Sequence, residues 1–122
     1  MSDSTTNIQQ LRDLLLKFRD DRNWSQFHDA KNLATAISIE ANELQEHFLW
    51  KSIDEINKKL ETDAQFKQKV SDELADVVIF CLNFANATNI DVSDVVQNKI
   101  DTNNKKYPVE KSAGTAKKYN EL

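Results

Sequence analysis

The chain has 122 residues, of which 39% are hydrophobic and 30% are charged, and it contains one glycine, Gly114, and one proline, Pro108. Because Gly-rich phosphate loops and the tight turns of hairpin-rich β folds both depend on glycine, the composition excludes the first and argues against the second. Helix-forming residues dominate, so we expect an all-α single domain. The formal net charge of −4 argues against a nucleic-acid polymer as the main partner.

The apolar segments are short. The longest run, Val77–Leu82, is far below the ~20 residues that a membrane-spanning helix needs, and the N-terminal segment MSDSTTNIQQ has no apolar stretch typical of a signal peptide. The one cysteine, Cys81, lies in that run and cannot form an internal disulfide. We therefore expect a protein of the reducing cytoplasm with no membrane partner.

Five helices are expected from apolar residues that recur at three- and four-residue spacings. In chain order they span residues 7–22, 30–49, 53–60, 63–87 and 92–106. The N-terminal capping signals are Asp29 for the second helix, Ser52 with Glu55 for the third, Thr62 with Gln65 for the fourth and Asp91 for the fifth. We assign residues 1–108 to one domain and the lysine-rich residues 109–122 to a flexible C-terminal tail.

The fourth expected helix is unusual because its segment Leu74–Leu82 reads LADVVIFCL and is apolar almost all round. A surface helix of a small monomer is polar on its outer face. Such a helix is either the centre of the bundle or shared with another subunit. Because a chain of this size rarely buries one helix completely, a homo-oligomer is favoured over a simple central helix.

Two of the expected helices carry acidic pairs within their apolar stripes. At 100° per residue, Glu40 falls inside the apolar arc of its helix and Glu43 lies one turn on, at the edge of the arc. Glu73 and Asp76 repeat this arrangement in the fourth helix. A single such pair usually lies on a solvated face, but two pairs in apolar stripes require compensation of their charge. A divalent cation with oxygen ligands, Mg²⁺ or Mn²⁺, provides it.

Other polar and aromatic residues accompany the acidic pairs. Lys99 and Asn103 lie one turn apart in the last helix, where a cation and an amide beside a metal site would suit a polyphosphate; a lysine near a helix end can equally extend into solvent. Trp24, His28 and Trp50 bracket the second helix. They are suited to stack a base or to form the edge of an ordinary core.

Together these residues resemble the all-α nucleoside triphosphate pyrophosphohydrolases of the MazG-like group, and within it the dCTP-pyrophosphatase-like branch. The resemblance covers about residues 11–108. The segments that carry it are WSQFHDAKNL (Trp24–Leu33), IEANELQEHFLW (Ile39–Trp50), DELADVVIF (Asp72–Phe80) and NKIDTNNKKYP (Asn98–Pro108).

This resemblance implies a four-helix core assembled into dimers or tetramers through the long helix. It also implies hydrolysis of a nucleoside triphosphate, dCTP or a related deoxynucleotide, to the monophosphate and pyrophosphate in house-cleaning of the nucleotide pool. The implied ligands of Mg²⁺, with Mn²⁺ as a substitute, are Glu40, Glu43, Glu73 and Asp76. The implied substrate-binding residues are Trp24, His28, Trp50 and Phe80 in the nucleotide pocket and Lys99 and Asn103 at the phosphates or sugar. Ile39 precedes Glu40 where many relatives have a second acid, so Glu40 and Glu43 are both candidates for the catalytic group that activates water.

Two other classes of protein share parts of this pattern. A di-iron carboxylate bundle needs a Glu-x-x-His motif from each of two helices. Here only His47, four residues after Glu43, lies near an acidic pair, and the long helix has no histidine. A non-catalytic helical adaptor would use the exposed face of the long helix for a partner and would bind neither a divalent metal nor a nucleotide.

Overall fold

A computed structural model describes all 122 residues and contains helices and no β-strand, which confirms the predicted all-α class. The chain divides into two compact units, Met1–Asn89 and Ile90–Leu122. None of its helices combines the length and the apolar character that crossing a lipid bilayer requires.

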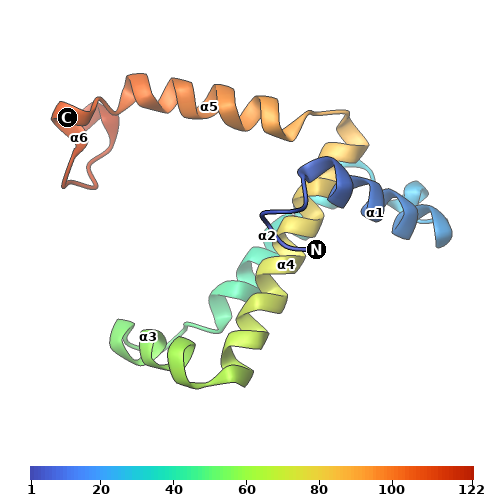
Figure 1. The fold of residues 1–122 in the computed structure, drawn as a ribbon, viewed down its shortest axis with the longest axis horizontal. Helices are drawn as coiled ribbons and strands as arrows, with labels where there is room; N and C mark the ends of the chain where they lie inside the picture. The colour runs from blue at the N-terminus through green and yellow to red at the C-terminus, as the bar shows by residue number, and fades with distance from the viewer. The chain divides into compact units, whose positions relative to one another are not determined.

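The first unit is built around one long helix. Its elements are α1 (Ile8–Asp21), the 3₁₀ turn η1 (Ser25–Phe27), α2 (Ala30–Glu46), α3 (Ile53–Thr62) and α4 (Ala64–Thr88). The central helix α4 contacts α1, α2 and α3, and its most extensive contact is with α2. Figure 1 shows that α2 and α4 run side by side in opposite directions, with α3 in the connection between them. This antiparallel pairing brings the acidic pairs of the two helices within reach of one another.

The second unit contains α5 (Val92–Lys106), the single turn α6 (Val109–Ser112) and the 3₁₀ turn η2 (Tyr119–Glu121). The last two elements lie in the segment that the sequence assigns to a tail. Within this unit the ring of Tyr107 packs edge-on against that of Tyr119, with centroids 6.2 Å apart. Gly114 adopts φ +78°, a left-handed conformation that favours glycine.

Three of the predicted capping residues are confirmed. Asp29, Ser52 and Asp91 each accept a hydrogen bond from the backbone N–H three residues on, at 2.8, 3.1 and 2.9 Å. Each bond satisfies one of the donors that the first turn of a helix leaves free, which contributes about 1 kcal/mol.

Two predicted helix boundaries were wrong. Thr62 does not cap the fourth helix; it ends α3, where its hydroxyl donates to the backbone oxygen of Lys58 at 2.8 Å. The next residue, Asp63, is the cap, because its extended backbone lets the carboxylate accept from the N–H of Phe66 at 3.1 Å. The second helix ends at Glu46, three residues before the predicted Leu49, and the chain then turns toward α3.

Two helices of this chain are followed by an asparagine in the left-handed backbone conformation that glycine often adopts at such positions. Asn23, after α1, and Asn89, after α4, have φ values of +54° and +55°. Asparagine tolerates this left-handed region better than other residues with a Cβ atom. Trp50, in the turn between α2 and α3, also has a positive φ, +63°, which is a rare conformation for a bulky side chain.

The buried core of the first unit lies between α2 and α4. Its buried apolar side chains are Leu33 from α2 and Phe66, Leu82 and Ala85 from α4. At the other side of α4, the side chain of Asn86 accepts from Arg12 Nε at 2.9 Å and donates to the Arg12 backbone oxygen at 3.2 Å, which ties α1 to α4. These contacts fix the three helices that carry the candidate site.

Candidate active site

Three carboxylates converge between α2 and α4. One oxygen each of Glu40, Glu73 and Asp76 lies within 4.8 Å of the other two. Because α2 and α4 are antiparallel, Glu40 from the first acidic pair faces both members of the second. Two ligands of one Mg²⁺ ion are at most about 4.2 Å apart, because each Mg–O bond is about 2.1 Å long, so side-chain shifts on the order of 1 Å would bring the three oxygens onto one ion.

Two oxygens of this cluster are not paired with any other protein group. Oε2 of Glu40 and Oε2 of Glu73 are buried and have no hydrogen-bond partner. Burial, then the adjacent carboxyl group of Glu43, then the charges of Asp76 and Glu73 raise the pKa of Glu40 to about 7. Buried carboxylate oxygens without donors are what a hard divalent cation binds, so the residues present fit a metal ion of this kind.

One histidine adjoins the cluster. Nε2 of His47, the residue after α2, lies 3.5 Å from Oε1 of Glu73. The same imidazole packs edge-on against Phe66, with ring centroids 6.5 Å apart. Glu73 thus has one oxygen toward His47 and the other buried without a partner, and one of its oxygens lies in the cluster with Glu40 and Asp76.

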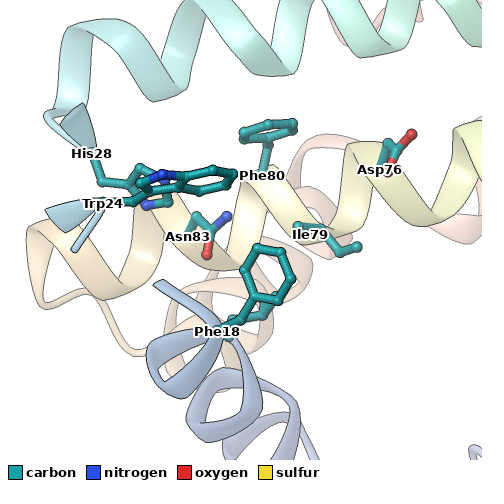
Figure 2. A pocket seen from close by; sticks show the side chains of 8 residues that line it. Phe18, Trp24, His28, Asp76, Ile79, Phe80 and Asn83 are labelled. Carbon is teal, nitrogen blue, oxygen red and sulfur yellow. The ribbon is translucent and has the colours of Figure 1, made fainter. Parts of the chain in front are cut away.

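A mostly apolar pocket begins at Asp76 and extends along α4. Its volume is about 260 Å³, and its lining comes from α1, from the segment before α2 and from α4. Figure 2 shows Trp24 and His28 at one end and Asp76 at the other, with Phe18 across from Phe80. The lining residues are Leu15, Phe18, Trp24, His28, Asp76, Ile79, Phe80 and Asn83.

The aromatic end of the pocket is held by local contacts. The rings of Phe18 and Trp24 meet edge-on with centroids 5.8 Å apart, and the guanidinium of Arg22 lies 3.6 Å from the centroid of Phe18. Burial, and then the positive charge of Arg19, lower the pKa of His28. Its imidazole is therefore neutral at neutral pH and offers one donor and one acceptor.

Several predicted site residues come together in this region. Glu40, Glu73 and Asp76 form the carboxylate cluster, and Trp24, His28 and Phe80 line the pocket. Asp76 belongs to both groups, so the cluster and the pocket are continuous.

Four other predicted site residues are not members of the carboxylate cluster or of the pocket lining. Glu43 adjoins Glu40 but is outside the set of three converging oxygens. Trp50 does not line the pocket, and the residue is 93% exposed. Lys99 and Asn103 are exposed residues of α5, which belongs to the second unit.

Four pocket residues were missed by reasoning from the sequence, namely Leu15, Phe18, Ile79 and Asn83. Leu15 and Phe18 are apolar residues at helical spacing in the first helix, Ile79 lies in the apolar run Val77–Leu82, and Asn83 directly follows that run. For Asn83 a signal was available: it is a polar residue seven positions after Asp76, and seven residues are close to two full helical turns. Both residues therefore lie on the same face of α4.

An all-helical fold that places three carboxylates beside an aromatic pocket is the arrangement expected of an all-α nucleotide pyrophosphohydrolase. Comparison with known proteins agrees with this class. A model of the MazG-like family matches residues 35–122. On that match, and on the relatives described next, the chain belongs to the MazG-like family.

The relatives are similar over nearly the whole chain. dCTP pyrophosphatase 1 of Mus musculus is 36% identical over 115 residues, which cover 94% of this chain and 67% of that protein. dCTP pyrophosphatase 1 of Bos taurus is 34% identical over 119 residues, which cover 98% and 70%. The crystal structure of a pyrophosphatase from Archaeoglobus fulgidus superposes with a TM-score of 0.77 at 38% identity, covering 88% of this chain and 98% of that one.

Proposed function

We propose that this protein hydrolyses a nucleoside triphosphate, dCTP or a related deoxynucleotide, to the monophosphate and pyrophosphate. It is an enzyme of the nucleoside triphosphate pyrophosphohydrolase class, as supported by relatives that are dCTP pyrophosphatases and by the similar pyrophosphatase structure. The observation that carries the assignment is the continuity of the carboxylate cluster with the aromatic pocket through Asp76. A triphosphate needs a cation at one end and a base needs stacking surfaces at the other.

The proposed metal ion is Mg²⁺, with Mn²⁺ as a substitute, held by Glu40, Glu73 and Asp76. Support comes from the oxygen-only donor set and from the two buried oxygens without partners. When bound, the ion neutralises phosphate charge and lowers the pKa of a coordinated water molecule. Glu43 is proposed either as a fourth ligand of this ion or as a neighbouring carboxylate that accepts a proton.

The residues of the chain bind the substrate and move a proton. Trp24 and Phe80 stack on the base, and neutral His28 adds a polar contact at that end of the pocket. Glu43 or Glu40 accepts the proton of the water that attacks the α-phosphorus. The bond between this phosphorus and the oxygen that bridges to the β-phosphorus breaks, and pyrophosphate leaves. Lys99 and Asn103, one turn apart on α5, are the proposed phosphate and sugar ligands.

The activity is tested by measuring pyrophosphate release from a panel of nucleoside triphosphates. With Mg²⁺ we expect monophosphate and pyrophosphate in equal amounts, the fastest turnover among deoxynucleotides such as dCTP, and no turnover in EDTA. Release of orthophosphate would contradict the proposed bond cleavage. If no nucleotide of the panel were hydrolysed and Mg²⁺ plus nucleotide did not raise the Tm, the protein would be better explained as a non-catalytic adaptor.

We expect the protein to be a homo-oligomer, a dimer or a tetramer, because one chain leaves much apolar surface uncovered. On α4, Leu74 and Val78 lie four residues apart and are 53% and 44% exposed. Leu49 and Trp50, in the turn between α2 and α3, and Ile53, the first residue of α3, are exposed as well. Apolar surface of this extent is typical of a subunit interface. A partner chain would cover the bulky side chain of Trp50.

We also propose that the protein is located in the cytoplasm, because the exposed free thiol of Cys81 fits a reducing compartment.

The oligomeric state is tested by light scattering on the purified protein. The expected mass is at least that of two chains, and the double substitution Leu74→Lys with Val78→Lys shifts it toward one chain, because charged side chains resist burial in an interface. Gln68→Lys, at an exposed polar position of the same helix, is the control and leaves the mass unchanged. A wild-type protein of one-chain mass would contradict the expectation.

A further inference from the structure

One buried amide in the pocket has no partner in the protein. Asn83 is only 8% exposed, and its side chain makes no hydrogen bond to another residue. Figure 2 shows this amide in the pocket, with Trp24 and Phe80 on one side and Phe18 on the other. The polar atoms of this amide are accessible from the pocket. The polar side-chain atoms that are both enclosed and without a partner belong to other residues.

A second asparagine on the same helix shows what a structural amide does here. Asn86 lies three residues further along α4, and its side chain makes two hydrogen bonds to Arg12. Most buried side-chain amides in folded proteins are paired in this way, because an amide removed from water without a partner loses free energy. Asn83 departs from that rule at the one place where a ligand is expected.

We propose that Asn83 is the residue that recognises the base, through hydrogen bonds between its amide and the polar edge of a cytosine. The assignment rests on the proposed function, since it requires a nucleotide in this pocket. An amide presents an acceptor and a donor side by side, which match the exocyclic amino group and the ring N3 of cytosine. Nothing in the protein fixes which way the amide points, so the base itself sets its orientation.

The position of Asn83 along α4 agrees with this role. Asp76, at the carboxylate cluster, and Asn83 are seven residues apart, which places them on one face and about 10 Å apart along the helix axis. That is close to the length of a nucleoside monophosphate. A nucleotide with its phosphates at Asp76 therefore has its base between Trp24, Phe80 and Phe18, at the height of Asn83.

The test compares two substrates and two proteins. The substrates are dCTP and its analogue that carries hydrogen in place of the exocyclic amino group, and the proteins are the wild type and Asn83→Leu, which keeps the side-chain volume without polar atoms. A paired amide and base edge discriminate by roughly ten- to a hundredfold. We expect Asn83→Leu to lower kcat/KM for dCTP by that factor and to leave the analogue nearly unchanged, so that the preference of the wild type for dCTP disappears.

Asn86→Ala is the matched control, because it removes an amide from the same helix that is already bonded to Arg12. It is expected to lower thermal stability and to keep the ratio of kcat/KM for the two substrates. An equal loss for both substrates in Asn83→Leu would assign Asn83 a packing role only and overturn the proposal. A wild-type ratio near one, or a preference for purine substrates, would overturn it as well.

A binding measurement separates this proposal from the proposed function. Calorimetry with dCMP reports on base recognition without requiring turnover, and we expect the Kd to rise roughly ten- to a hundredfold in Asn83→Leu. If no triphosphate is hydrolysed and dCMP still binds in this manner, the proposed activity fails and the assignment of Asn83 stands. Equal binding of dCMP to the two proteins would overturn the assignment, whatever the activity.

Discussion

Replacing Glu40 by glutamine is expected to remove pyrophosphohydrolase activity while leaving the helices folded. Glu40 is the only member of the carboxylate cluster contributed by α2, and its buried Oε2 has no partner in the protein. An amide of the same size keeps the packing but loses the negative charge that a divalent cation requires. We expect kcat/KM to fall by at least about a hundredfold, as when one group that stabilises transition-state charge is removed.

The control for this substitution is Glu46→Gln on the same helix. Glu46 is exposed, accepts a hydrogen bond from Asn42 and lies outside the cluster, so its replacement is expected to leave turnover unchanged. Pyrophosphate release measures activity, calorimetry with Mn²⁺ measures metal binding, and circular dichroism checks the helix content. Wild-type turnover in Glu40→Gln would show that the cluster is not the metal centre.

The second prediction concerns the metal-free protein, whose stability is expected to fall as the pH rises. Glu40 has a pKa of about 7 in the folded state and its ordinary value of about 4.5 in the unfolded chain. Between these values the folded state binds more protons than the unfolded state, so the free energy of unfolding decreases with rising pH across that window and levels off above it. In EDTA, the Tm is therefore expected to be lower near pH 8 than near pH 5.

Mg²⁺ is expected to reverse this loss, since a cation that binds only the folded state stabilises it and compensates the ionised carboxylates. Thermal denaturation followed by circular dichroism checks both effects. Glu40→Gln, which does not titrate, separates the contribution of Glu40 from that of the other acidic groups: its Tm should change less between the two pH values. A wild-type protein that is equally stable at both, without metal, would contradict the raised pKa.

The fold was largely predictable because its signals are local. Helix periodicity and the capping side chains of Asp29, Ser52 and Asp91 depend on residues within one turn of each other. The error at Thr62 arose because two adjacent residues can both accept from the first turn, and the backbone conformation of Asp63 decided between them. That conformation depends on how α3 and α4 meet, which no local pattern contains.

The candidate site was predictable in part. A polar residue inside an apolar stripe is visible in the sequence, which is why Glu40, Glu73 and Asp76 were singled out before their convergence was seen. Asn83 has the same signature, but its significance depends on an amide left without a partner in three dimensions. The exposure of Trp50 depends in the same way on the left-handed turn that follows α2.

The single helix α4 has a further consequence for how substrate preference can change. It contributes two carboxylates near its middle and one amide two turns later, all on a rigid rod. If Asn83 recognises the base as we propose, exchanging the side chain at position 83 would alter the base that is accepted without moving the carboxylates of Glu73 and Asp76. Such a chain can acquire a new substrate by one substitution. Inserting a single residue between Asp76 and Asn83 would instead rotate the amide by about 100° around the helix axis, so that it would no longer lie on the same face as the carboxylate.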